Sequence, residues 1–374
     1  MKLHSPFQRC HELAGARFLD WGGWQLPAVY SSTEEEVHTV RTAVGYAEFP
    51  FLSHMVVEGP DALAALQRGC SRNLESCAPG RGVYTLMLND DGSVADDGMV
   101  FRLSSERFIV SVPGPNPRSL PPATGFQRLK EPKLWLRRVH EGRLCIHEMN
   151  AFVLVVQGPL SMEMLRPVVD FADLPLRAIR EVKVGNVPAL CARTGFTGEA
   201  GVEFFVWPEY AIDLWETVAA LGRSQNAVPY GIQCTLTLGI EKGFLNANDF
   251  YQGATPFELG VSWLVAMDKP EFVGRQALVQ RRSDGIRSKL VGIELRAEAV
   301  TPLAGQALLF EGEVVGAVTN AAFSPTLRKT LVRGWLPVEL TAAGTPVTVL
   351  VHGLPSRGTV AESYRWYDPE NTRL

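Results

Sequence analysis

Apolar residues recur at helical spacing in three segments of the chain. The segment STEEEVHTVRTAVG opens with Ser32 and Thr33, two good helix-capping residues, followed by glutamates that suit the first turn of a helix. The segments PDALAALQRGCSRNL and PEYAIDLWETVAALGR show the same period, so the pattern predicts three helices. The apolar residues expected on their inward faces are Val37, Val40, Val44, Leu63, Leu66, Leu214, Val218 and Leu221.

Extended segments lie between the predicted helices. They are short runs rich in β-branched residues: HMVVEG, VYTLML, SVADDGMVFRL, RFIVSV and AFVLVVQGP. The sequence NDDG joins the second run to the third, and its Asp91-Gly92 pair predicts a tight hairpin turn. The order of helices and strands lacks the strict rhythm of a doubly wound parallel sheet, which favours a mixed fold.

Two further segments contain too much glycine and proline for regular structure. FLDWGGWQLPAVY includes Gly22, Gly23 and Pro27, which break any helical period, and we expect an ordered loop there. PGPNPRSLPPATGFQRLKEP has no apolar period at all. We expect it to be a surface loop.

The character of the chain changes after residue 284. Short extended runs such as KLVGIELR and TPVTVLVHGLPSRGTVAESY are punctuated by glycine and proline, which is typical of an all-β domain. The preceding segment QRRSDGIRS is polar and lacks an apolar pattern, so we place the boundary near residues 280 to 288. The predicted domains are 1–284, of mixed structure with two subdomains, and 285–374, all β.

Length and composition add limits to this picture. A chain of 374 residues exceeds what one hydrophobic core normally serves, which agrees with several domains. The formal net charge of −4 provides no field that would attract nucleic acid or anionic lipid, so neither is expected as a partner. The six cysteines are scattered without the spacing of metal ligands. We therefore expect no bound metal. No apolar run has the length of a signal-peptide core or a membrane span, so we expect a cytoplasmic protein.

A series of motifs carries more specific information. They are GARFLDWGGWQLPAVY, LSHMVVEGPDAL, YTLMLNDDGSVADDGMV, VVQGP, RTGFTGEAGVEFFV, LGIEKGF, TPFELGVSWLV, FVGRQAL and FSPTLRK. In this order and spacing they resemble the motifs of the glycine-cleavage T-protein (aminomethyltransferase) superfamily. The resemblance covers most of residues 12 to 365, and RTGFTGEAGVEFFV is its most recognisable part.

The resemblance implies both a fold and a kind of chemistry. The fold is α+β: a T-protein-like folate-binding core with a ferredoxin-like part, followed by a C-terminal all-β barrel or jelly-roll domain. The implied protein is an enzyme that binds tetrahydrofolate and transfers a methyl or methylene group to it.

Two adjacent carboxylates in SVADDGMV are candidates for that chemistry. Transfer of carbon to a folate nitrogen requires management of a proton, which an aspartate beside that nitrogen can provide. On a strand, Asp96 and Asp97 point to opposite faces, so only one readily faces a pocket. Spacing alone does not choose between them, and two solvated hairpin residues are the alternative. The resemblance assigns the folate-contacting, catalytic role to Asp96.

The motif GFTGEAGVEFF supplies the other candidates. Its glycines let the backbone approach a flat ring, and Glu203 lies on the strand that follows. The resemblance assigns Glu203 to the pterin, because a carboxylate can accept two N–H groups at once; a surface charge is the alternative. Phe196 stands where the family usually has tyrosine, so ring stacking is kept and a hydroxyl is lost. Met55 and Tyr84 match further cofactor-binding positions, although each would suit a core equally well.

Three other residues in the motifs are expected to be structural. A histidine on an apolar strand is more often a satisfied structural residue than a catalytic one, so His54 is left out of the site. Trp263 is expected to pack beneath the pocket, and Glu241 to hold a loop.

The sequence departs from the classical enzyme at three positions. Thr235 and Leu236 align with an Arg-Asp pair, and Pro113 replaces an asparagine and brings neither a polar side chain nor an N–H. The resemblance places these positions around the folate tail and the reacting carbon. We therefore expect a tetrahydrofolate-dependent one-carbon transferase that demethylates a small molecule.

Two alternatives stay open. One is a glycine-cleavage aminomethyltransferase, whose substrate is an aminomethyl group on a lipoyl carrier protein; the missing Arg-Asp pair argues against it. The other is a non-enzymatic folate-binding factor of iron–sulfur assembly, which usually has a cysteine-bearing KGCYxGQE-like motif that this chain lacks. The identity of the donor is expected to depend on irregular loops, where specificity usually lies.

Overall fold

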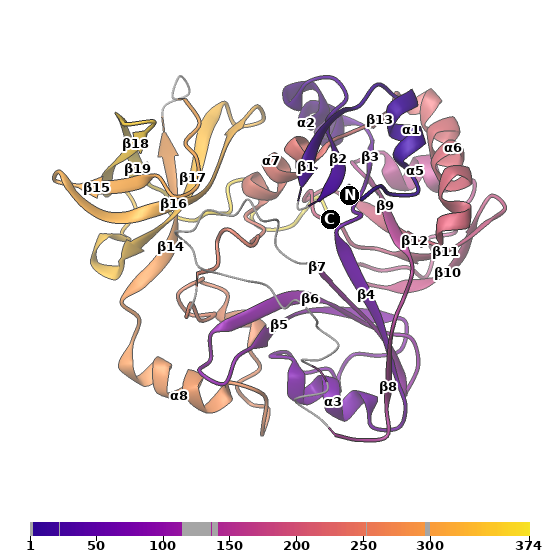
Figure 1. Ribbon diagram of the computed structural model, residues 1–374, viewed down its shortest axis with the longest axis horizontal. Coiled ribbons are helices and arrows are strands. Elements are labelled where there is room, and N and C mark those ends of the chain that lie inside the picture. Colours follow the sequence, from indigo (N-terminus) through magenta and orange to yellow (C-terminus); the bar gives the residue numbers. More distant parts are fainter. Residues whose placement is uncertain (1–2, 22, 114–135, 137–140, 252, 296–299) are drawn as a thin grey trace.

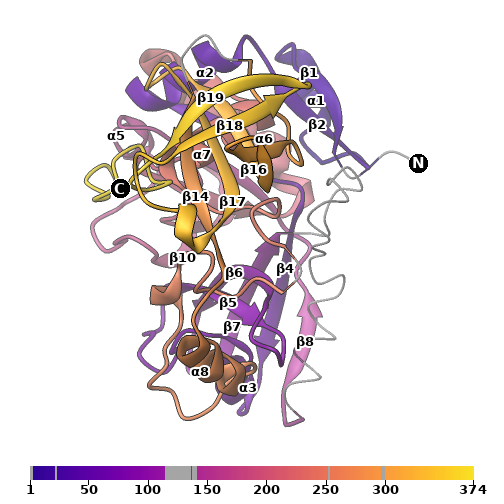
Figure 2. The same ribbon diagram turned by 90° about the vertical axis from the view of Figure 1, so that its left-hand side faces the viewer.

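A computed structural model describes residues 3–21, 23–113, 136, 141–251, 253–295 and 300–374. Figure 1 shows three lobes around the middle of the molecule: a six-stranded sheet with helices, a five-stranded sheet, and a barrel. In the side view of Figure 2 the five-stranded sheet and the helices α3 and α8 lie below the other two lobes. The predicted surface loop lies outside the described residues, except for Pro113.

The first sheet has the strand order β10-β11-β12-β9-β3-β13. Its strands are β3 (Gly45–Glu48), β9 (Phe152–Gln157), β10 (Ile179–Val184), β11 (Val187–Ala192), β12 (Gly201–Val206) and β13 (Val228–Pro229). One face packs on a core that includes residues of α1 (Gln8–Leu13), α5 (Ser161–Leu165) and α6 (Ala211–Gly222). The other face packs on α2 (Thr33–Thr42) and α7 (Ile232–Lys242) and meets the second sheet.

The second sheet has the order β5-β6-β7-β4-β8. Its strands are β4 (Leu52–Glu58), β5 (Arg81–Leu88), β6 (Val94–Arg102), β7 (Arg107–Pro113) and β8 (Cys145–Glu148). Helix α3 (Ala62–Gly69) covers one face. On the other face Phe101 and Ile109 join the core of the first sheet, so the two sheets share apolar packing.

The barrel is closed by six strands in the order β14-β17-β16-β15-β18-β19. They are β14 (Ser288–Leu295), β15 (Ala307–Phe310), β16 (Glu313–Ser324), β17 (Lys329–Pro337), β18 (Pro346–Val351) and β19 (Leu354–Val360). Helix α8 (Arg275–Asp284) precedes it, so the division proposed between residues 284 and 285 falls between this helix and the first barrel strand. Short 3-10 turns occur at Pro208–Tyr210, Arg223–Gln225, Ser262–Leu264 and Val338–Leu340.

The predicted helices and the predicted hairpin are present. In α2 the Ser32 hydroxyl accepts the N–H of Glu35, as its capping pattern predicts, and Val37 and Val40 are fully buried. Val44 is buried but follows the helix, and Leu221 in α6 is only partly buried. The turn between β5 and β6 contains Gly92 with a φ of +79°, which suits a residue without Cβ.

The prediction of an ordered loop at FLDWGGWQLPAVY is wrong. Most of this segment lies in two strands that pair antiparallel, β1 (Arg17–Trp21) and β2 (Trp24–Val29). Gly23 lies between the two strands with a φ of +95° and does not interrupt them, and Gly22 lies outside the described residues. Pro27 is tolerated because this two-stranded sheet consists of edges.

Candidate functional site

Glu203 lies on the face of the first sheet that meets the second sheet. Alternate residues of a strand share a face, so Glu203 and Phe205 of β12 point the same way. Phe205 packs against two residues of the second sheet, with ring centroids 4.8 Å from His54 and 6.0 Å from Phe101. The predicted pterin carboxyl is therefore placed where the two sheets come together.

The Glu203 carboxyl is largely buried and has one open oxygen. Oε2 accepts a hydrogen bond of 2.5 Å from the Thr194 hydroxyl, whereas Oε1 accepts none from the described residues. Burial raises the pKa of Glu203 to about 7, and the hydrogen bond from Thr194 only partly offsets this. An open carboxyl oxygen in such surroundings is a strong acceptor for a buried N–H donor, which fits the predicted contact with a pterin.

The two aspartates of β6 lie on opposite faces of the second sheet, as predicted. Asp97 pairs in register with Leu86, and the Tyr84 hydroxyl donates a 2.8 Å hydrogen bond to its Oδ2. Asp96 pairs with Met87, whose side chain packs on the α3 side of the sheet. Both carboxyls are buried, which rules out two solvated hairpin residues.

This geometry divides the residues predicted for the site. Met55 is a core residue on the α3 side, the side that Asp96 also faces by register. On the opposite side, Asp97 shares its face with Met99 and Phe101, which pack toward Phe205 of the first sheet. Asp97 and its partner Tyr84 thus lie on the face of the second sheet that packs toward the first. The role predicted for Asp96 stays a prediction, while register favours its neighbour.

Phe196 lies on the same side of the first sheet as Glu203. It belongs to the apolar cluster that contains Phe205, and its ring centroid is 5.3 Å from that of Phe244. A Cβ at Gly239 of α7 would come within 2.5 Å of the Phe196 ring. Glycine at that position lets the helix approach the ring closely.

Two polar residues of this region were not assigned to the site from the sequence: His54 was set aside as structural, and Tyr230 was not considered. His54 and Tyr230 are buried, and neither ring nitrogen of His54 nor the Tyr230 hydroxyl has a hydrogen-bond partner among the described residues. Burial lowers the pKa of His54 to about 4, so its imidazole is neutral. Burial, and then negative charges that include Glu203, raise the pKa of Tyr230 well above its ordinary value. His54 is therefore not the satisfied structural residue that was expected, and no sequence signal marks Tyr230.

Gln157 of β9 holds the loop that bears Phe196. Its Nε2 donates to the Thr194 carbonyl at 3.0 Å, and its Oε1 accepts from the Thr197 hydroxyl at 2.8 Å. A Cβ at Gly195 would lie 1.9 Å from the same Oε1, so the motif requires glycine there. Thr194 in turn holds Glu203, so this amide sets the position of the predicted acceptor carboxyl.

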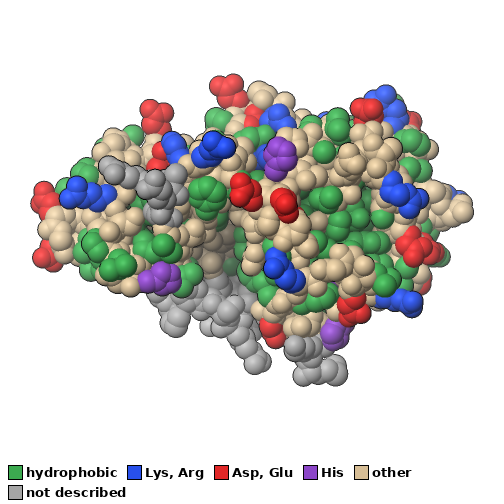
Figure 3. All heavy atoms as spheres, turned by 90° about the horizontal axis from the view of Figure 1, so that it is seen from above, with side chains coloured by type: hydrophobic (Ala, Val, Ile, Leu, Met, Phe, Trp, Pro, Cys, Tyr) green, Lys and Arg blue, Asp and Glu red, His purple; other side chains and the backbone are tan. Residues whose placement is uncertain are grey.

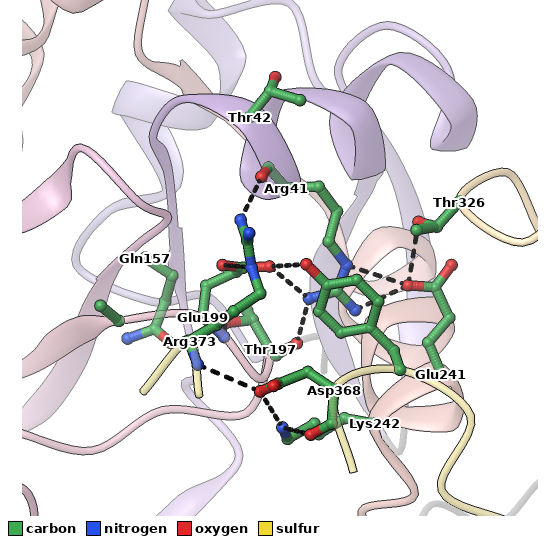
Figure 4. Close-up of polar contacts among 12 residues, drawn as sticks. Arg41, Thr42, Gln157, Thr197, Glu199, Glu241, Lys242, Thr326, Asp368 and Arg373 are labelled. Atoms are coloured by element: carbon green, nitrogen blue, oxygen red, sulfur yellow. Dashed lines mark hydrogen bonds and ion pairs between the residues drawn. The ribbon is translucent and has the colours of Figure 1, made fainter. Parts of the chain in front are cut away.

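A buried ionic cluster also holds this loop (Figure 4). Arg41 of α2 donates to the Thr197 carbonyl at 2.7 Å and to Glu199 Oε1 at 3.0 Å. Its Nη2 also donates to Glu241 Oε2 of α7 at 2.7 Å. Glu241 accepts from the hydroxyl of Ser324 as well, so it holds a loop, as expected.

The remaining predicted positions lie away from this cluster. Thr235 lines a small pocket between β2, β3 and α7, and its hydroxyl donates to the Gly231 carbonyl at 3.2 Å. The other lining residues are Leu26, Pro27, Ala47, Glu48, Phe51, Tyr230, Gly231 and Ile232. Trp263 is 48% exposed, with the Arg365 guanidinium 5.8 Å from its ring, so the expectation that it packs beneath a pocket is wrong.

The surface charges, the arrangement of possible metal ligands and the length of the helices bear on other kinds of function. On the face in Figure 3, charged side chains of both signs are interspersed with apolar ones. Among the described residues, no group of three or more His, Cys, Asp and Glu side chains is arranged to hold a metal ion. In the part of the chain that the structure describes, no helix is both long and apolar enough to cross a membrane.

Comparison with known proteins identifies the fold and the family. The family model described as the GCVT N-terminal domain matches residues 7–269, and that of the glycine cleavage T-protein C-terminal barrel domain matches residues 288–368. An aminomethyltransferase of Symbiobacterium thermophilum is 33% identical over 379 residues, covering 98% of this chain and 97% of its own. One of Halothermothrix orenii is 29% identical, covering 96% and 98%.

A solved structure shows the same arrangement. The crystal structure of glycine cleavage system aminomethyltransferase T from Bartonella henselae superposes with a TM-score of 0.85 at 23% identity, covering 97% of both chains. A two-sheet core followed by a six-stranded barrel is thus a T-protein fold. The chain belongs to the glycine cleavage T-protein family. This confirms the resemblance, the α+β fold class and the predicted kind of enzyme, a tetrahydrofolate-dependent transferase of the aminomethyltransferase type.

The raised pKa of Glu203 makes stability depend on pH. A carboxyl whose folded pKa lies above its unfolded value binds more protons when folded, so it lowers stability as pH rises from about 4.5 to about 7. Between pH 5 and pH 8 the free energy of unfolding of the wild type should fall by up to about 3 kcal/mol more than that of Glu203→Gln. Urea unfolding of both proteins at the two pH values measures this difference. Parallel losses in the two proteins would show that folding does not raise the pKa of Glu203.

Proposed function

We propose that this protein transfers the carbon of an aminomethyl group on a lipoyl carrier protein to tetrahydrofolate. The bonds of that carbon to nitrogen and to the lipoyl sulfur break, so methylene-tetrahydrofolate, ammonia and the free lipoyl thiol are formed. The support from relatives is that chains named aminomethyltransferase match it almost from end to end. The structural observation that carries the proposal is the largely buried Glu203 carboxyl, whose Oε1 has no hydrogen-bond donor among the described residues. The Tyr84–Asp97 pair lies on the face of the second sheet that packs toward the first. This revises the expectation of a small-molecule demethylase, which becomes the second candidate.

The chain's own residues divide the work of such a site. Tetrahydrofolate supplies the nucleophilic nitrogen that accepts the carbon. Glu203 binds the ring by accepting an N–H group at Oε1, since Oε2 already accepts from Thr194, and Phe196 offers an aromatic face on the same side of the sheet. Asp97, oriented by the Tyr84 hydroxyl, is placed to hold or move a proton. The apolar packing between the sheets keeps bulk water away from these groups.

One specific observation favours the second candidate, the small-molecule demethylase. Thr235 has an uncharged side chain, and it lines a pocket together with apolar residues, the Glu48 carboxyl and Tyr230. A site without the Arg-Asp pair of the classical enzyme could take a small methylated donor in place of a carrier protein. The two candidates share the acceptor and differ only in the donor.

An assay with both kinds of donor separates the candidates. We expect methylene-tetrahydrofolate to form, as measured by mass spectrometry, when an aminomethylated lipoyl carrier protein is supplied with tetrahydrofolate. A panel of methylated sulfonium, amine and methoxy compounds should give none. Product from the small molecules alone would favour the demethylase, and product from neither would remove the proposed reaction.

The two aspartates of β6 form a matched pair for a second test. Asp97→Asn should lower turnover by about 10²- to 10⁴-fold, the usual contribution of a general acid or base. Asp96→Asn should lower it much less, because that side chain faces α3. Circular dichroism of both variants controls for folding. The opposite ranking in steady-state turnover would return the catalytic role to Asp96, as first predicted.

A further inference from the structure

The last described segment of the chain, residues 366–374, packs against the core that carries Glu203. The N–H groups of Trp366 and Tyr367 both donate to the Glu241 carbonyl of α7, at 3.0 and 2.8 Å. The Tyr367 ring lies under the Arg41 guanidinium, 3.7 Å from its centroid. The Arg373 guanidinium reaches back to the Arg41 carbonyl at 2.9 Å. The segment therefore touches both helices that cover the site face of the first sheet.

The same segment grips the loop that bears Phe196. The Tyr367 hydroxyl donates to Glu199 Oε1 at 2.6 Å, and Arg373 Nε donates to Glu199 Oε2 at 2.8 Å (Figure 4). Glu199 is 2% exposed, so both contacts are made to a buried carboxylate. Such charge-assisted hydrogen bonds are among the strongest that side chains make.

A second contact holds the turn of that loop. Gly198 has a φ of +82°, and a Cβ there would lie 2.6 Å from the Lys242 side chain. Lys242 Nζ donates to Asp368 Oδ2 at 2.8 Å. Burial opposes ionisation of Asp368, yet its hydrogen bonds from Lys242 and Thr372 outweigh burial and hold its pKa well below the ordinary value. This ion pair ties the segment to the lysine that packs against the turn.

An unbroken series of contacts leads from this segment to Glu203. Arg41, stacked on Tyr367, donates to the Thr197 carbonyl. The Thr197 hydroxyl donates to Gln157, and Gln157 donates to the Thr194 carbonyl. The Thr194 hydroxyl donates to Glu203. A shift of residues 366–374 would therefore change the position of the Glu203 carboxyl, because each side chain in the series is hydrogen-bonded to the next.

We propose that residues 366–374 are a positioning element for the acceptor site, which holds the 194–200 loop and thereby aims Glu203 at the bound pterin. This rests on the function proposed above. Tyr367 and Arg373 act through Glu199 and do not touch the acceptor. By linkage, if docking of the segment strengthens binding of tetrahydrofolate, the bound folate strengthens docking by the same factor.

Arg373 provides the best variant. Its side chain is 39% exposed, and Glu199 keeps its contact with Arg41 when it is removed, so the fold should survive. We expect Arg373→Ala to weaken the tetrahydrofolate Kd by about fivefold or more, the usual lower range of coupling between sites. Arg373→Lys should recover part of the loss. Glu370→Gln, an exposed change in the same segment outside the cluster, should bind as the wild type does.

Hydrogen exchange of the wild type provides a second measurement. If the segment had only a structural role, its exchange rate would not depend on tetrahydrofolate. Saturating tetrahydrofolate should slow exchange of peptides covering 366–374. If the wild type binds tetrahydrofolate but Arg373→Ala and Tyr367→Phe both bind equally well, and exchange of the segment is unchanged, the inference is overturned while the proposed function stands. If the wild type does not bind tetrahydrofolate, the proposed function fails and takes this inference with it.

Discussion

The burial of the Arg41 guanidinium is the constraint on which the arrangement of the core depends. A charge that is 5% exposed is tolerable only if its N–H groups find acceptors, and removing one partner of such a pair typically costs about 3–5 kcal/mol. Glu199, Glu241 and the Thr197 carbonyl supply those acceptors from a loop and a second helix. One side chain of α2 therefore fixes the elements that surround the candidate site. With Arg373, Lys242 and Asp368 the cluster holds three cations and three anions, so it carries no net charge.

This constraint matters for function because the candidate site is assembled from separate pieces. Glu203 comes from the first sheet, and the Tyr84–Asp97 pair comes from the second. Neither sheet alone presents both carboxyls, so the site exists only while the sheets keep their packing around Phe205 and Phe101. The ionic cluster holds the loop before β12, and the apolar contacts hold the sheets together. Stability and site geometry are thus served by the same contacts.

Much of this could be predicted from the sequence, because the local signals were strong. The capping pattern at Ser32 and the Asp-Gly pair at Gly92 are determined by nearby residues and form as expected. The motif resemblance gave the family and Glu203 as a candidate. It did not show which of Asp96 and Asp97 faces the first sheet, because that depends on strand register. The lone polar atoms of His54 and Tyr230, and the hairpin around Gly23, likewise depend on packing between distant segments.

The claim that Glu203 receives the pterin is tested most directly by its affinity for tetrahydrofolate. Isothermal titration calorimetry at pH 8 compares the wild type with Glu203→Gln, after circular dichroism has shown that the variant is folded. Loss of a hydrogen bond to a charged acceptor costs about 1.5–3 kcal/mol, so the account predicts that the variant binds about 10- to 150-fold more weakly. Equal affinity of the two folded proteins would contradict it and place the acceptor elsewhere.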